Sequence, residues 1–85
     1  MRRPNVIIIT LDALRPDHLG CYGYGRNTSP NIDKIAQKGA IFKEAIAQGS
    51  HNAASNTSLI TSTYPNVHRV MDWGYQLNPN IKHTF

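Results

Sequence analysis

The strongest fold signal in the sequence is the run Asn5-Val6-Ile7-Ile8-Ile9-Thr10-Leu11, which Asp12 follows directly. This run is short, continuous and β-branched, and Pro4 precedes it. Such a run is typical of a strand buried on both faces, as in a parallel sheet, because a half-exposed strand would alternate apolar and polar residues. We therefore expect a strand over residues 5–11 that needs neighbouring strands and covering helices.

Downstream of this run, a loop precedes a helix with clear end signals. Residues 12–25 contain Pro16 and three glycines, so we expect a loop with at most one turn of helix. Ser29 as N-cap and Pro30 at the first helical position predict a helix that ends at Gly39. Three apolar residues in this helix recur at helical spacing: Ile32, Ile35 and Ala36.

The second half of the chain repeats this order with weaker signals. Residues 40–47 are ambiguous, and we favour a short strand or an extended segment that leads into a loop. Residues 53–62 predict a weak helix, because asparagine, serine and threonine compete for backbone hydrogen bonds. Pro65 breaks that helix, and the tail from Met71 reads as a surface loop. The order strand, loop, helix, strand, loop, helix is the opening of an α/β fold with an incomplete parallel sheet.

Length and composition exclude several classes of protein. The 85 residues form one domain at most, and 40% of them are apolar. The net charge of +4 is scattered rather than clustered, which argues against a nucleic-acid partner. No apolar run approaches the roughly 20 residues that cross a bilayer, so we expect no membrane association. Cys21 is the only cysteine, which fits a reducing compartment, and we expect a cytoplasmic location.

Asp12 is the first candidate for chemistry. It follows the C-terminal end of the predicted buried strand, where ligands and catalytic groups gather in open α/β sheets. A carboxylate in this position is a good ligand for a hard cation. It is equally suited to cap the turn that follows, and position alone does not separate these two roles.

Many further residues match one set of motifs in order and spacing. They are Arg3 to Asp12, Leu14 to Tyr24, Asn27 to Asp33, Gly39, Phe42, Ala45, Ala47, Gln48, Ser58 to Thr61, Tyr64 and Pro65. With these residues the chain resembles the N-terminal signature of sulfatases, which are metal-dependent sulfate and phosphate ester hydrolases of the alkaline phosphatase superfamily. The similarity runs from Arg3 to Val70 without a gap. It implies that residues 1–85 are a truncated sulfatase-like N-terminal segment of a three-layer α/β/α fold.

The resemblance also implies a metal ligand. Asp12 matches the first-strand aspartate that binds the catalytic divalent cation, usually Ca²⁺ and in relatives Mg²⁺, Mn²⁺ or Zn²⁺. Many sulfatases carry a second aspartate directly afterwards, where this chain has Ala13. Relatives that act on phosphate or phosphonate esters also lack this second aspartate. The motif therefore does not distinguish a sulfate ester from a phosphate or phosphonate ester as the substrate. One carboxylate and one amide do not hold a divalent ion tightly.

Asn52 falls at the position that the resemblance gives to the nucleophile. Sulfatases have a cysteine or serine there, which is oxidised to formylglycine, within the pattern Cys-or-Ser, x, Pro, Ser, Arg. This chain has Asn52, Ala53, Ala54, Ser55 and Asn56 in those places, so only the serine matches. A carboxamide is a poor nucleophile, and we expect no formylglycine. The alternative role for Asn52 is helix N-cap.

Two neighbours of Asn52 are weaker candidates. Ser55 is the only hydroxyl near enough in sequence to be a substitute nucleophile. His51 could contact an anion, although a surface role is the simpler expectation. If the resemblance extends to the site, Asp12 should lie beside Asn52.

Three functional hypotheses follow. The first is a sulfate ester hydrolase whose N-terminal segment is inactive alone. The second is a phosphate or phosphonate ester hydrolase, or a phosphotransferase, of the same superfamily. The third is a non-catalytic remnant that donates its strand to a partner, either another copy or the remainder of the fold, because an unpaired apolar strand exposes an edge.

Overall fold

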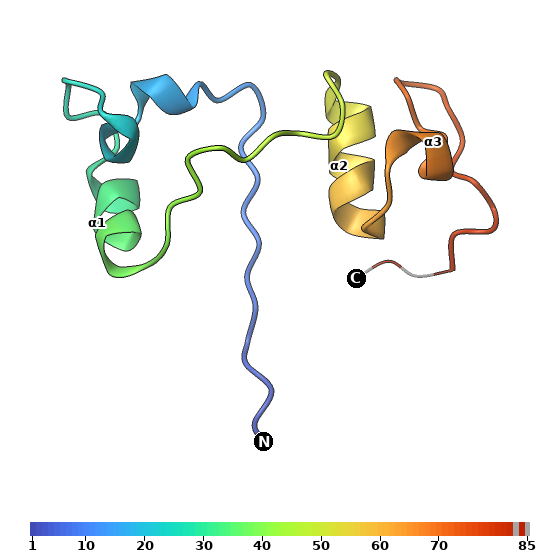
Figure 1. The fold of residues 1–85 in the computed structure, drawn as a ribbon, viewed down its shortest axis with the longest axis horizontal. Coiled ribbons are helices and arrows are strands. Elements are labelled where there is room, and N and C mark those ends of the chain that lie inside the picture. Colours follow the sequence, from blue (N-terminus) through green and yellow to red (C-terminus); the bar gives the residue numbers. More distant parts are fainter. Residues whose placement is uncertain (83, 85) are drawn as a thin grey trace. The chain divides into compact units, whose positions relative to one another are not determined.

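The computed structural model describes residues 1–82 and 84 and consists of helices joined by loops (Figure 1). The chain divides into two compact units, Met1–Lys43 and Glu44–Phe85. The first unit contains two 3-10 turns, η1 (Pro16–His18) and η2 (Gly20–Tyr22), and the helix α1 (Pro30–Lys38). The second unit contains α2 (Asn52–Thr61) and the short helix α3 (Pro65–His68).

The predicted strand over residues 5–11 is not formed. This segment is an extended coil (Figure 1), and residues 1–82 and 84 contain no strand. Its side chains are exposed, including Val6 at 74%, Ile7 at 85% and Ile9 at 79%. A strand exists only when its backbone pairs with a neighbour, and no described segment provides one. The strand alternative for residues 40–47 is wrong for the same reason, and this segment is a loop with one turn.

The helix α1 confirms the prediction from its end signals. It begins at Pro30, directly after Ser29, and ends before Gly39. Ser29 occupies the N-cap position, but its side chain makes no capping bond to the helix backbone. The predicted apolar stripe is present, yet Ile32 and Ile35 are exposed, because nothing in the first unit covers that face.

Ser29 and Asp33 instead join α1 to the turn η2. The Ser29 hydroxyl donates to Asp33 Oδ1 at 3.0 Å and accepts the Gly20 N–H at 2.9 Å. Asp33 Oδ1 also accepts the Cys21 N–H at 2.8 Å. A Cβ on residue 20 would overlap the Asp33 carboxylate, so only glycine permits this close approach. The side chains of Ser29 and Asp33 therefore attach the start of α1 to η2.

The helix α2 confirms the predicted helix apart from one residue at each end. Its N-cap is His51, whose backbone is extended at φ −103° and ψ 147°. Asn52 is the first helical residue, so the hypothesis that Asn52 is the N-cap is wrong. The helix ends at Thr61, and the C-cap residue Ser62 adopts the left-handed conformation at φ 54°.

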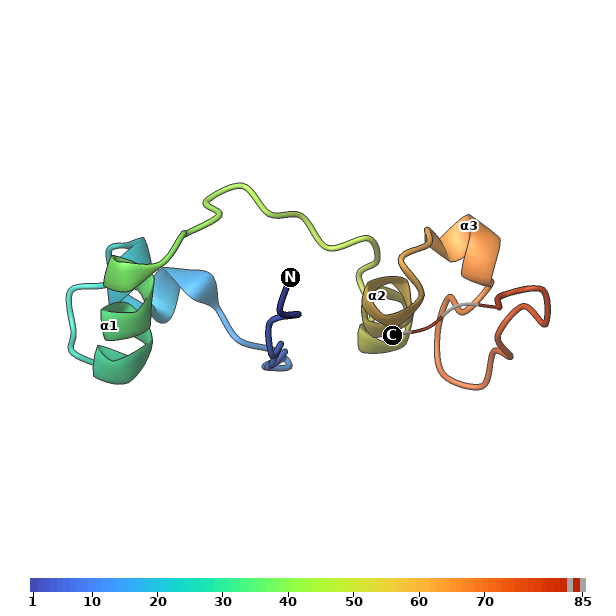
Figure 2. The same cartoon turned by 90° about the horizontal axis from the view of Figure 1, so that it is seen from below.

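The helices α2 and α3 pack against each other in the second unit (Figures 1 and 2). The interior of this packing is small and partly polar, with Ala54, Ser58, Thr61 and His68 buried. The predicted surface loop after Met71 is confirmed, and Asn78 attaches it to α3. The Asn78 backbone N–H donates to the His68 carbonyl at 3.0 Å, and its side chain donates to the Val67 carbonyl at 2.9 Å.

Candidate functional site

Asp12 lies in an exposed turn of the first unit. The backbone reverses directly after it, because Ala13 adopts the left-handed region at φ 53°. No three His, Cys, Asp or Glu side chains of residues 1–82 and 84 lie close enough together to hold a metal ion. A hard cation such as Ca²⁺ takes about six to eight oxygen ligands. The described residues therefore supply one candidate ligand and not a complete metal site.

Asn52 lies in the second unit, at the exposed start of α2. Asp12 and Asn52 therefore belong to different units. That Asp12 lies beside Asn52 stays a prediction.

The hydroxyl of Ser55 is bonded to the helix backbone. It lies 3.0 Å from the His51 carbonyl oxygen and 3.3 Å from the Asn52 carbonyl oxygen, and it can donate to either. A serine nucleophile needs a general base that accepts its proton. The hydrogen bonds of Ser55 lead to carbonyls instead, so its geometry gives no support to a role as substitute nucleophile.

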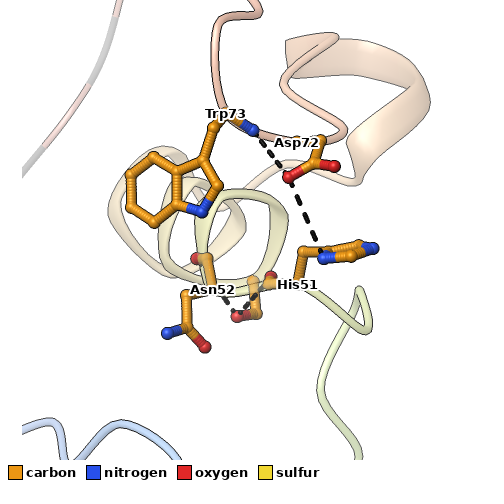
Figure 3. Close-up of polar contacts among 5 residues, drawn as sticks. His51, Asn52, Asp72 and Trp73 are labelled. Atoms are coloured by element: carbon orange, nitrogen blue, oxygen red, sulfur yellow. Dashed lines mark hydrogen bonds and ion pairs between the residues drawn. The ribbon is translucent and has the colours of Figure 1, made fainter.

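A group of polar and aromatic side chains surrounds the start of α2 (Figure 3). Asp72 Oδ1 accepts the Trp73 backbone N–H at 2.7 Å and lies 3.9 Å from His51 Nδ1. Both His51 and Asp72 are well exposed to solvent, so their attraction is screened and small. The pair nevertheless joins the loop after α3 to the residue that precedes α2.

This loop and α2 line an open, shallow hollow of about 500 Å³. The side chains that give it its chemical character are Asn52, Asn56, Ile60, Asp72, Trp73 and Tyr75. The sequence predicts that Asn52 lies near a functional site, but it predicts only a surface loop for Asp72, Trp73 and Tyr75. The sequence feature that could have indicated this hollow is the pair Trp73 and Tyr75, which flank Gly74 in an otherwise polar tail.

Comparison with known proteins identifies the family. The family model described as Sulfatase matches residues 4–84. The chain is 42% identical over 69 residues to iduronate 2-sulfatase of Homo sapiens, an alignment covering 81% of this chain and 12% of that protein. It is 36% identical over 64 residues to N-acetylgalactosamine-6-O-sulfatase of Bacteroides thetaiotaomicron, covering 75% of this chain and 12% of that protein.

A third relative, arylsulfatase A of Homo sapiens, is 36% identical over 64 residues, covering 75% of this chain and 13% of that protein. No solved structure matches the chain significantly. The chain belongs to the sulfatase family, which confirms the resemblance drawn from its motifs. It spans 12% of the length of iduronate 2-sulfatase. No helix of the described residues is long and apolar enough to span a membrane.

Proposed function

We propose that this chain provides the N-terminal part of the active site of a sulfate ester hydrolase and does not hydrolyse esters by itself. The observation that carries this proposal is the sulfatase family match over residues 4–84, which includes both Asp12 and Asn52. Each of these residues is exposed, so each is free to meet a ligand.

In this proposal Asp12 is one ligand of a divalent cation. Its carboxylate is exposed in a turn and is suited to Ca²⁺, Mg²⁺ or Mn²⁺. The described part of the chain brings no second carboxylate, histidine or thiolate group into a three-residue cluster with it. Cation binding by this chain alone should therefore be weak.

In this proposal Asn52 occupies the position of the family's nucleophile but cannot act as a nucleophile. Its carboxamide has no hydroxyl or thiol that a metal or a base can activate. Asn56 also replaces the arginine of the family pattern, so the charge that would face a sulfate group is missing. Both substitutions predict that the chain is inactive alone.

The test is an assay of the purified chain with 4-nitrophenyl sulfate and 4-nitrophenyl phosphate, each with Ca²⁺, Mg²⁺ or Mn²⁺. We expect no turnover above that of the buffer with either ester. Metal-dependent turnover that disappears in Asp12→Asn would overturn the proposed inactivity and identify which ester is the substrate.

A second measurement tests the role of Asp12 without relying on activity. Paramagnetic Mn²⁺ should broaden the backbone amide signals of residues 12–14 first, and Asp12→Asn should remove this effect. Glu44→Gln is the matched control, because it removes an exposed carboxylate of the second unit. Equal broadening at Asp12 and Glu44 would contradict a specific role for Asp12.

The exposed segment 5–11 favours a second proposal about the fold. We propose that it becomes a strand of a parallel sheet when a partner polypeptide provides neighbouring strands, because its apolar side chains are uncovered. Light scattering coupled to size-exclusion chromatography tests this idea. A stable monomer at all concentrations would argue against it, whereas self-association that is lost in Ile7→Lys would support it.

A further inference from the structure

We propose that His68 is an acid switch, which holds the loop after α3 (residues 69–82) on the second unit while its imidazole is neutral and releases the loop when the imidazole is protonated. This inference goes beyond the proposed function, because it concerns how the hollow beside Asn52 is formed and does not require ester hydrolysis. The parts of the switch are the buried imidazole, its two hydrogen-bond partners and the loop that it anchors.

The last turn of α3 anchors this loop at two places. Near the start of the loop, the Val70 backbone N–H donates to His68 Nδ1 at 3.0 Å. Further along, the Asn78 backbone N–H donates to the His68 carbonyl at 3.0 Å, and the Asn78 side chain donates to the Val67 carbonyl at 2.9 Å. The segment between the two anchors carries three side chains that line the hollow: Asp72, Trp73 and Tyr75. The attachment of the loop to His68 therefore decides whether this wall of the hollow is in place.

The ring of His68 is bonded in a way that leaves no place for a second proton. His68 is 0% exposed, and its Nε2 lies 2.8 Å from the Ser58 hydroxyl oxygen. In the neutral imidazole Nδ1 is the acceptor for Val70, and Nε2 carries the proton. A protonated imidazole is a donor at both nitrogens, so its Nδ1–H would point at the Val70 N–H. Protonation therefore breaks the hydrogen bond that holds the start of the loop.

The elements packed around His68 supply no negative charge to a protonated ring. The helix α2 contains no charged residue, and α3 contains none besides His68. The titratable groups of the neighbouring segments are His51, Tyr64, Arg69, Asp72, Tyr75 and Lys82. Among residues 1–82 and 84, no ion pair joins His68 to an acid. A buried charge without a partner is costly, whereas the same charge on a solvated ring is not, so the protonated chain favours the released loop.

A second histidine contacts the same loop, but it acts in the opposite direction. His51 Nδ1 lies 3.9 Å from Asp72 Oδ1 and joins the loop to the start of α2 (Figure 3). Protonation of His51 adds a positive charge beside this carboxylate, which attracts the loop toward α2. Both side chains are well exposed, so this attraction is small. A loop that loosens in acid therefore points to His68 and not to His51.

The test follows the loop and the imidazole on the same samples across the range in which histidine changes its charge, about pH 8 to about pH 5. Hydrogen exchange gives the protection factors of the backbone amides, and imidazole ¹⁵N resonances give the protonation state of His68. We expect the protection of the Val70 and Asn78 amides to fall at least about tenfold, as His68 becomes protonated, because a buried hydrogen bond is lost. The Asp33 amide donates to the Ser29 carbonyl at 2.9 Å in the first unit, and it is the internal control that should keep its protection.

Two variants assign the transition, because the chain contains four histidines. His68→Asn offers Val70 a carboxamide oxygen that does not take up a proton in this range, so the protection of the loop should no longer depend on pH. His51→Gln is the matched control, since it removes the other histidine that contacts the loop and should retain the transition. If His68→Asn does not fold, the coincidence of the two midpoints in the unchanged chain decides the question.

Two outcomes would overturn the inference. One is full protection of the Val70 amide in samples whose His68 imidazole is protonated, which would show that the loop does not respond to this charge. The other is a transition that persists in His68→Asn or disappears in His51→Gln, which would assign it to a different group. Neither outcome depends on ester hydrolysis or on cation binding by Asp12, so failure here is distinguishable from failure of the proposed function.

Discussion

The hydroxyl oxygen of Ser58 and the Nε2 atom of His68 lie 2.8 Å apart in the interior of the second unit, where His68 is 0% exposed. The Val70 backbone N–H donates to His68 Nδ1 at 3.0 Å, so Nδ1 acts as the acceptor. A neutral imidazole then carries its proton on Nε2 and donates it to Ser58. A nitrogen that already holds a proton cannot accept one from a serine, so this pair is structural and not a nucleophile with its base.

The tautomer of His68 is the first prediction. In the neutral imidazole, Nε2 should carry the proton and Nδ1 should not, because the Val70 backbone N–H donates to Nδ1. Long-range ¹H–¹⁵N correlation spectra of the imidazole distinguish the two nitrogens directly. A protonated Nδ1 would contradict the described hydrogen bond from Val70.

Ser58→Ala should destabilise the packing of α2 against α3. The substitution leaves the buried Nε2–H of His68 without an acceptor, which costs about 1–3 kcal/mol. The measurement is hydrogen exchange of the Val70 amide, whose protection should fall accordingly. Ser50→Ala is the matched control, because Ser50 is exposed and precedes α2. Equal effects of the two substitutions would show that the buried pair contributes nothing.

Gly20→Ala should disrupt the first unit. The new methyl group would overlap the Asp33 carboxylate and push it away from the Cys21 N–H. Overpacking of this kind costs about 1–3 kcal/mol. Gly25→Ala is the control, since a Cβ there meets no atom within 4 Å. Faster exchange of the Cys21 amide in Gly20→Ala, and not in Gly25→Ala, is the expected result.

The thiol of Cys21 should stay protonated above its ordinary pKa of 9.0. Partial burial raises its pKa, and the hydrogen bond and negative charge of Asp33 raise it further. Because the pKa of Cys21 is higher in the folded chain, the protonated thiol contributes fully to folding stability below pH 9.0. This contribution is lost as the pH rises through the pKa of the folded chain.

Alkylation by iodoacetamide measures this shift. The reaction should be slower in the folded chain than in urea at the same pH, because the thiolate is the reactive form. Asp33→Asn should lower the pKa of Cys21 and accelerate the reaction. An unchanged rate in urea would argue that Asp33 and burial have no effect on the thiol.

The ion pair of Arg15 and Asp17 should be visible in titrations. The Arg15 guanidinium donates to both carboxylate oxygens of Asp17, at 3.1 and 2.6 Å, and this holds the pKa of Asp17 below 3.8. Because the pKa of Asp17 is lower in the folded chain, the ion pair contributes fully to folding stability above pH 3.8. This contribution is lost as the pH falls through the pKa of the folded chain.

In Arg15→Gln the pKa of Asp17 should return toward 3.8, as followed by the carboxylate carbon resonance. Arg26→Gln keeps the ion pair and removes a different exposed arginine, so it should leave the titration of Asp17 unchanged. A similar response to both substitutions would indicate a general charge effect.

The helices α1 and α2 could be predicted from sequence because their signals are local, whereas α3 begins at Pro65, which was expected only to break a helix. Ser29, Pro30 and Gly39 fixed the bounds of α1 through interactions within a few residues. The strand over residues 5–11 was predicted from the same kind of signal and is not formed. A strand needs a partner far away in sequence, and the pattern of one segment carries no information on whether a partner is present.

The family of this protein, its two main helices and the candidate residues Asp12 and Asn52 could all be read from the sequence alone. Three contacts became visible only in the folded units: His68 is buried against Ser58, Ser29 bonds to Gly20, and Trp73 lines a hollow with Asn52. Helix caps and helical periodicity act between neighbouring residues, so the local sequence specifies them. Contacts between residues nine or more positions apart depend on the path of the intervening chain, and that path is set by the packing of each whole unit.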